Sequence, residues 1–81
     1  MKQKAPHPID LEVGRKIRAI RVERGISQQE VANSLGITFQ QLQKYEKGIN
    51  RISVSRLVLI ARALDVPPAS LLPAERTYVK P

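Results

Sequence analysis

Four side chains between residues 39 and 44 share one face of the chain if this segment is helical, namely Phe39, Gln40, Gln43 and Lys44. A glutamine amide can bond adenine through both of its polar atoms, a lysine ammonium can donate to guanine, and a phenylalanine ring can contact a thymine methyl. Side chains of these types can read base edges in the major groove of DNA. An ordinary solvated helix surface carries similar residues. The neighbouring segments of the chain are therefore needed to distinguish a DNA-reading face from a solvated one.

A capping box and a glycine predict the first of those elements. Ser27-x-x-Glu30 begins a helix, because the hydroxyl and the carboxyl cap each other's backbone donors. Val31 and Leu35 follow at the spacing of one buried side. Gly36 then stands where the chain must turn, and that turn favours a residue that tolerates positive φ.

A second capping box, Thr38-x-x-Gln41, starts another helix directly after the turn, over residues 39–47. Its inner arc lies opposite the face described above and comprises Gln41, Leu42, Tyr45 and Glu46. We expect this arc to pack on the body, and Gln41 to act as a cap rather than to read bases. The two segments form a helix-turn-helix, which favours the base-reading interpretation over a solvated surface.

The rest of the chain predicts three more helices. One begins after Asp10 as its N-cap and runs to about Arg24. Another follows Ser53, and a short one follows Pro67 and ends at Pro73. Apolar residues at helical spacing mark the buried sides: Val13, Ile17, Ile20, Leu57, Ile60, Ala61, Leu64, Leu71 and Leu72.

Length and composition bound the class of protein. Eighty-one residues make one domain, and we expect a folded part at 10–73 between a flexible basic tail at 1–9 and a C-terminal tail at 74–81. The formal net charge of +7 suits a nucleic-acid partner. The chain has no cysteine for a disulfide or a thiolate metal site, and its single histidine, His7, is expected to be inert. We therefore expect an all-α protein in the cytoplasm, associated with the nucleoid.

Catalysis, cofactors and membranes are not expected. A general acid–base pair needs two groups that converge on a pocket, whereas the seven carboxylates here are dispersed. The chain has no phosphate-binding loop and no dinucleotide fingerprint, so neither a cofactor, a metal nor a small-molecule ligand is expected. No apolar run approaches the ~20 residues of a membrane span.

The segment from Val13 to Leu72 resembles the lambda repressor/Cro-type helix-turn-helix family, also called the XRE family. The matching residues are Gln28, Val31, Ala32, Leu35, Gly36, Ile37, Leu42, Tyr45, Glu46, Gly48, Ser53, Leu57 and the run from Ala63 to Pro67 with Leu71 and Leu72. The resemblance implies a compact five-helix DNA-binding domain. It further implies a bacterial transcriptional regulator, expected to be a repressor, that binds as a dimer.

Contacts with DNA phosphates are expected outside the base-reading face. The resemblance assigns Gln28 to one of them, at a helix N-terminus where free N–H groups favour an anion. Lys47, Asn50 and Arg51 follow the second motif helix, and Thr38 precedes it, so all four can lie along the sugar-phosphate backbone. A solvated loop is the alternative for Lys47 and Arg51. Arg56 is left open between the two roles.

An internal ion pair is implied between Arg21 of the first helix and Glu46 at the end of the second motif helix. Both residues flank apolar stripes, so the pair is expected to be partly desolvated and to fix the angle of the motif helix.

The expected partner is double-stranded DNA with a palindromic operator, read by a homodimer. Candidate contact residues are Val66, Pro67, Leu71, Leu72 and Tyr78, which could instead only close the core of the monomer. The alternative function is a protein-interaction module, such as an antitoxin that autoregulates its operon. The run from Thr77 to Pro81 offers little surface for that role.

Overall fold

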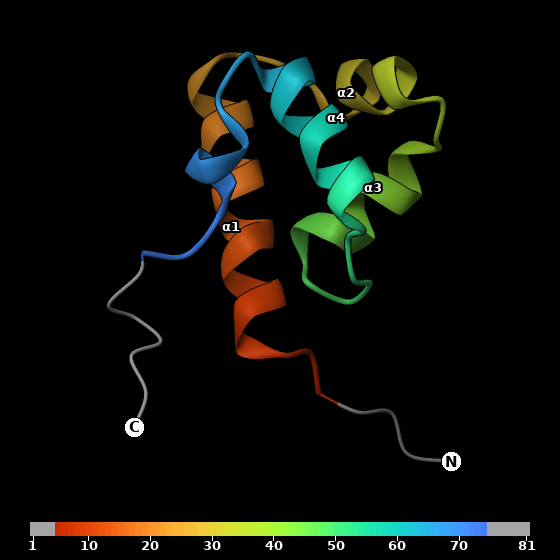
Figure 1. Cartoon of the computed structure of the whole chain (residues 1–81). Coiled ribbons are helices and arrows are strands. Elements are labelled where there is room, and N and C mark those ends of the chain that lie inside the picture. The colour runs from red at the N-terminus through yellow and green to blue at the C-terminus, as the bar shows by residue number, and fades with distance from the viewer. Residues whose placement is uncertain (1–4, 75–81) are drawn as a thin grey trace.

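A computed structural model describes residues 5–74, which form four α-helices and one short 3-10 helix (Figure 1). In chain order these are α1 (Pro8–Glu23), α2 (Gln28–Leu35), α3 (Phe39–Glu46), α4 (Val54–Leu64) and η1 (Pro68–Leu71). No strand occurs within this part of the chain, which agrees with the all-α class. Residues 1–4 and 75–81 lie outside the described part, which leaves most of the predicted C-terminal tail undescribed. The predicted N-terminal tail at 1–9 is too long, because α1 already begins at Pro8.

The predicted fifth helix is a 3-10 helix of four residues, so residues 5–74 contain four α-helices and not five. Prolines explain the difference. Pro68 starts η1, and Pro73 holds the residue before it, Leu72, in extended backbone with φ −95° and ψ 153°. The segment between them is too short for an α-helix, yet it suffices to place Leu71 in the core, fully buried.

Helix α1 begins before Asp10, and the residue predicted to be inert, His7, is its N-cap. The Nδ1 atom of His7 accepts from the backbone N–H of Ile9 at 3.0 Å. Pro8 occupies the first helical position, where its fixed φ suits the helix and its missing N–H costs nothing. Asp10 therefore lies within the first turn, where its carboxylate interacts favourably with the positive end of the helix dipole.

The start of the helix-turn-helix follows the predicted local signals. Ser27 Oγ accepts from the Glu30 N–H at 3.0 Å, and Glu30 Oε1 accepts from the Ser27 N–H at 2.8 Å. The pKa of the Glu30 carboxyl is lowered, mainly by its hydrogen bond with the backbone of Ser27 and to a smaller extent by that with the Ser27 hydroxyl. Gly36 ends α2 with φ 69° and ψ 30°, the left-handed conformation predicted for the turn.

At the start of α3, the second capping box forms through the hydrogen bond from the N3 backbone N–H to the N-cap side chain. Thr38 Oγ1 accepts from the Gln41 N–H at 3.1 Å. Lys47, predicted to be the last residue of this helix, is its C-cap.

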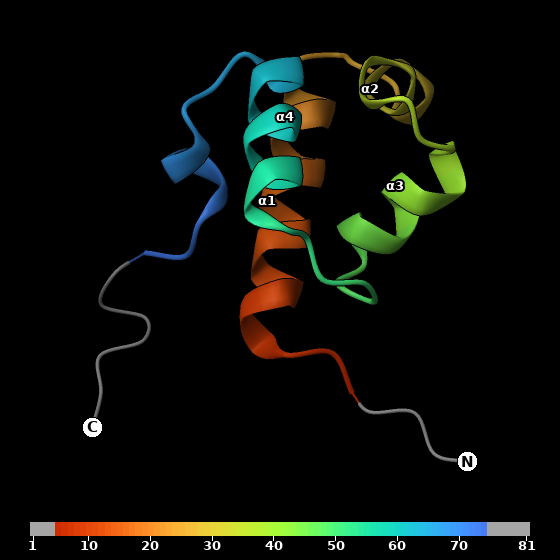
Figure 2. The same cartoon turned by 45° about the vertical axis from the view of Figure 1, so that its right-hand side comes forward.

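Each helix contributes one apolar stripe to the core. The fully or nearly buried side chains are Val13, Ile17, Val31, Ala32, Leu42, Tyr45, Ile60, Ala61, Leu64 and Leu71. Three residues predicted to be buried, Ile20, Leu35 and Leu57, are only partly buried at its edge, and Leu72 is 45% exposed. Figure 2 shows α2 and α3 on one side of α1 and α4, and η1 on the other. This arrangement presents α3 at the surface with α1 directly behind it.

Gly14 allows α1 to touch the C-terminal end of α3. A Cβ atom at Gly14 would lie 2.6 Å from the carbonyl oxygen of Tyr45, and closer still to that of Glu46. Both neighbours are backbone atoms, which cannot turn aside as a flexible side chain could. Only glycine therefore fits this crossing without a shift of one helix.

Arg21 of α1 and Glu46 of α3 form an ion pair at the same junction. Arg21 Nε lies 2.6 Å from Glu46 Oε2, and Nη2 lies 3.2 Å from Oε1. Arg21 Nη1 also donates to the carbonyl of Ile26 at 3.0 Å, in the segment before α2. The two paired side chains are 11% and 3% exposed. The pair that was expected to be partly desolvated is thus a bidentate ion pair that joins α1 to α3.

A double-mutant cycle with Arg21→Met and Glu46→Gln should show strong coupling in the free energy of unfolding, measured by denaturant titration. Either single change leaves a buried polar or charged group without its partner, which we expect to cost about 3–5 kcal/mol. The double variant should cost less than the sum by about 1–3 kcal/mol.

The exposed pair Asp10–Arg51 provides the matched control. Its Arg51 side chain is 82% exposed, so its coupling should stay below about 1 kcal/mol. Equal coupling in the two cycles would contradict a special role for the buried pair.

Candidate nucleic-acid interface

The outer face of α3 carries three of the four predicted base readers in the open. Phe39 is 38% exposed, although it is a large apolar residue, and Gln40 and Lys44 are exposed beside it. Leu42, on the opposite side of the same helix, is fully buried. The helix is therefore anchored by one face and offers amide, ammonium and aromatic groups on the other.

Gln43, the fourth predicted base reader, is half-buried and has a partner within the protein. Its Nε2 atom donates to Oε1 of Gln28 at 3.3 Å. Gln28 Nε2 in turn donates to Glu46 Oε1 at 3.0 Å. The side chain of Gln28, which the resemblance assigned to a phosphate, is thus bonded at both ends inside the protein. Sequence reasoning missed this link, because Gln28 and Gln43 are 15 residues apart.

The predicted backbone contacts surround α3. Thr38 and Lys47 are exposed at its two ends, and Asn50 is half-buried in the loop that follows. Arg51 is highly exposed, with its Nε atom 3.4 Å from Oδ2 of Asp10. These residues bring a hydroxyl, an amide and two cations to the two ends of the exposed helix.

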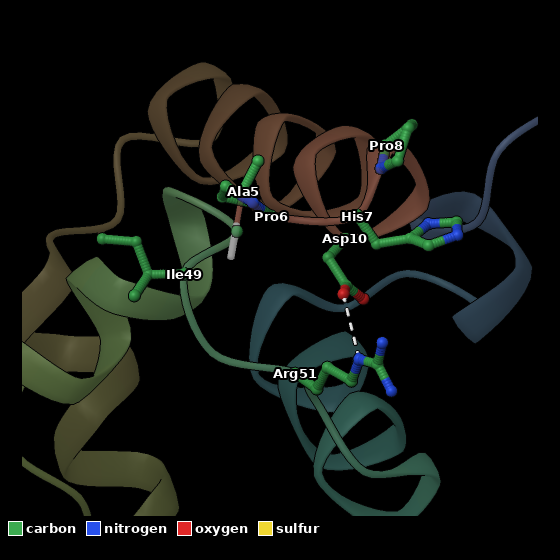
Figure 3. A pocket seen from close by; sticks show the side chains of 8 residues that line it. Ala5, Pro6, His7, Pro8, Asp10, Ile49 and Arg51 are labelled. Atoms are coloured by element: carbon green, nitrogen blue, oxygen red, sulfur yellow. Dashed lines mark ion pairs between the residues drawn. The ribbon is translucent and has the colours of Figure 1, made fainter. Parts of the chain in front are cut away.

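The start of α1 and the loop after α3 enclose a surface hollow of about 430 Å³ (Figure 3). Its lining residues are Ala5, Pro6, His7, Pro8, Asp10, Gly48, Ile49 and Arg51. The Asp10–Arg51 ion pair crosses it. The sequence held one signal for this contribution from the N-terminal segment, since Pro8 favours the first position of a helix.

Arg56, left open between a phosphate contact and a solvated position, has a contact inside the protein. Its Nη1 atom donates to the carbonyl of Leu35 at 3.3 Å. Arg56 thereby joins α4 to the last turn of α2, where unpaired carbonyls attract a cation.

Residues 5–74 contain no group of three or more histidines, cysteines or carboxylates that could hold a metal ion. None of the helices described is long and apolar enough to cross a membrane.

Comparison with known proteins identifies the family. A family model described as Helix-turn-helix (HTH_3) matches residues 17–71. An HTH-type transcriptional regulator of Sinorhizobium medicae is 55% identical over 65 residues, which are 80% of this chain and 47% of that protein. The HTH-type transcriptional regulator RC0668 of Rickettsia conorii is 60% identical over 57 residues, 70% of this chain and 46% of that protein.

The chain is also similar to a solved structure, the crystal structure of the DNA-binding domain of BldD. The TM-score is 0.72 with 31% sequence identity, over 80% of this chain and 94% of that one. The chain spans about half the length of the two curated relatives. Since the family model covers more than half of the chain, this protein belongs to the XRE family of helix-turn-helix regulators.

Proposed function

We propose that this protein binds double-stranded DNA in a sequence-specific manner, with α3 in the major groove, and regulates transcription as a repressor. The observation that carries this proposal is the exposed face of α3, on a helix fixed to the body by buried Leu42 and by the Arg21–Glu46 pair. Repression requires only that the protein occupies its operator. A DNA-binding domain suffices for that.

Base edges are read by Phe39, Gln40, Gln43 and Lys44 in this proposal. Gln40 and Lys44 lie one turn apart on the exposed face and reach adjacent base pairs. Phe39 lies against a thymine methyl, which accounts for an aromatic ring left at the surface.

Phosphates are bound on both sides of this helix. Lys47 and Arg51 supply charge, and Thr38 and Asn50 supply hydrogen-bonding groups. Gln28 contributes through its backbone N–H at the start of α2, because its side chain has partners within the protein. Such contacts fix the position of the protein on the duplex without reading its sequence.

A homodimer on a palindromic operator completes the proposal. Leu71 is fully buried and closes the core of the monomer, so it is removed from the predicted contact surface. Tyr78 lies outside the described residues. Leu72 and Val54 are 45% and 79% exposed and line an apolar groove, which provides surface for a second copy.

Alanine at Gln40 or Lys44 should weaken binding to the preferred DNA site by about 1–3 kcal/mol and relax the preference at the base pair that each side chain reads. The measurement is selection of sites from a random duplex pool, followed by titration of the selected and random duplexes. Affinity for random duplex should change much less. If both variants select the wild-type motif, these residues do not read bases.

Alanine at Lys47 or Arg51 should instead weaken binding equally on selected and random duplexes. Loss of one phosphate contact should also make the slope of log affinity against log salt shallower by about 0.9 unit. Arg18→Ala is the matched control, since Arg18 is an exposed cation of α1 that we place on a solvated face. A slope unchanged in Lys47→Ala and Arg51→Ala would argue against their phosphate contacts.

Insertion of five base pairs between two half-sites should abolish tight binding in gel shifts. Half-site centres about 10–10.5 base pairs apart present the same side of the duplex, whereas the insertion turns one half-site to the opposite side. A ten-base-pair insertion serves as the control because it restores the phase. Affinity unaffected by either insertion would mean that monomers bind independently.

A further inference from the structure

A row of hydrogen bonds leads from the buried ion pair to the DNA-facing side of α3. Arg21 holds Glu46, which accepts from Gln28 Nε2 at 3.0 Å. Gln28 Oε1 then accepts from Gln43 Nε2 at 3.3 Å. The row begins at the 3% exposed Glu46 side chain and ends at half-buried Gln43, next to exposed Gln40 and Lys44.

The chemistry of Glu46 fixes the direction of each bond in this row. A carboxylate paired with a guanidinium is ionised and can only accept hydrogen bonds. Gln28 must therefore turn its NH₂ group toward Glu46, which leaves its carbonyl oxygen for Gln43. Gln43 must in turn present its NH₂ group to that oxygen. A reversed Gln43 amide would set two carbonyl oxygens against each other.

We infer that Gln28 is a positioning residue that sets the orientation in which Gln43 reads DNA, an inference that rests on the proposed function. One N–H of the Gln43 amide is used by Gln28, so one N–H and the carbonyl oxygen remain. One donor and one acceptor match N7 and the N6 amino group of adenine, whereas guanine presents two acceptors at the corresponding atoms.

The contact with Gln28 also fixes the order in which the Gln43 amide presents its donor and its acceptor. Rotation of a glutamine amide by half a turn exchanges its donor and its acceptor in space. Contact with Gln28 excludes the exchanged form, so Gln43 offers its groups in a single order along the groove. That order distinguishes an A·T pair from a T·A pair at one position of the operator. The orientation also exists before DNA binds, which reduces the freedom lost on binding.

Gln28→Met tests the inference, because methionine keeps the length of the side chain and removes both amide groups. Gln29→Met is the matched control: Gln29 is an exposed neighbour in the same turn, bonded to Asn33. The experiment selects sites from a random duplex pool with the wild type, the two methionine variants, Gln43→Ala and the Gln28→Met/Gln43→Ala double variant. Denaturant unfolding first establishes that each variant is folded, and Gln28→Ala replaces Gln28→Met if it is not.

Gln28→Met should reduce the preference for adenine at one base pair by about threefold or more, part of the roughly 5- to 150-fold that a bidentate contact provides. The same base pair should lose its preference in Gln43→Ala, and the double variant should add nothing at that position. Affinity for random duplex should match that of Gln29→Met.

Two results would overturn the inference, and they are distinguishable. If Gln28→Met weakens all duplexes equally with a shallower salt slope, its side chain binds a phosphate and does not orient Gln43. If Gln43→Ala selects the wild-type motif, Gln43 reads no base, so both its part in the proposed function and the role of Gln28 are wrong. Base reading by Gln40 and Lys44 is tested separately by their own variants.

Discussion

The contact between Arg21 and Glu46 is the constraint on which the surface of this protein depends. Two charges with little access to solvent are stable only when they are paired and hydrogen-bonded. Here the guanidinium bonds Glu46 with two nitrogens and the carbonyl of Ile26 with the third. A single side chain of α1 therefore fixes the end of α3 and the segment that leads into α2.

The position of α3 follows from this contact together with two apolar ones. Gly14 brings the backbones of α1 and α3 within direct contact, and Leu42 fills the core below the helix. A helix of eight residues has little stability of its own, so most of its order comes from this packing. On the opposite face, Phe39, Gln40 and Lys44 are exposed and are not needed for this packing. Their side chains are therefore available to bind a partner.

The same carboxylate connects stability with recognition. Glu46 has lone pairs beyond those used by Arg21, and one of its oxygens accepts from Gln28. The charge that holds the helix in place also orients an amide on the path to Gln43. A pair of apolar side chains could also anchor α3, but it would offer Gln28 no acceptor and would therefore not set the direction of the glutamine amides.

Local signals along the chain are sufficient to predict most of the helix ends and turns. The caps at Ser27 and Thr38 and the left-handed turn at Gly36 depend on residues at most a few positions apart, so their signals can be read along the chain. The periodic apolar residues likewise determined which side of each helix faces inward. Local reasoning was wrong where two local signals competed, as at His7-Pro8 against Asp10, and where prolines shortened a helix to η1. The partners of Gln28, Asp10 and Arg56, in contrast, depend on tertiary packing and could not be predicted from the sequence. Each is a polar side chain with several partners of suitable chemistry, and the choice among them depends on which distant elements the packed core brings within hydrogen-bonding distance.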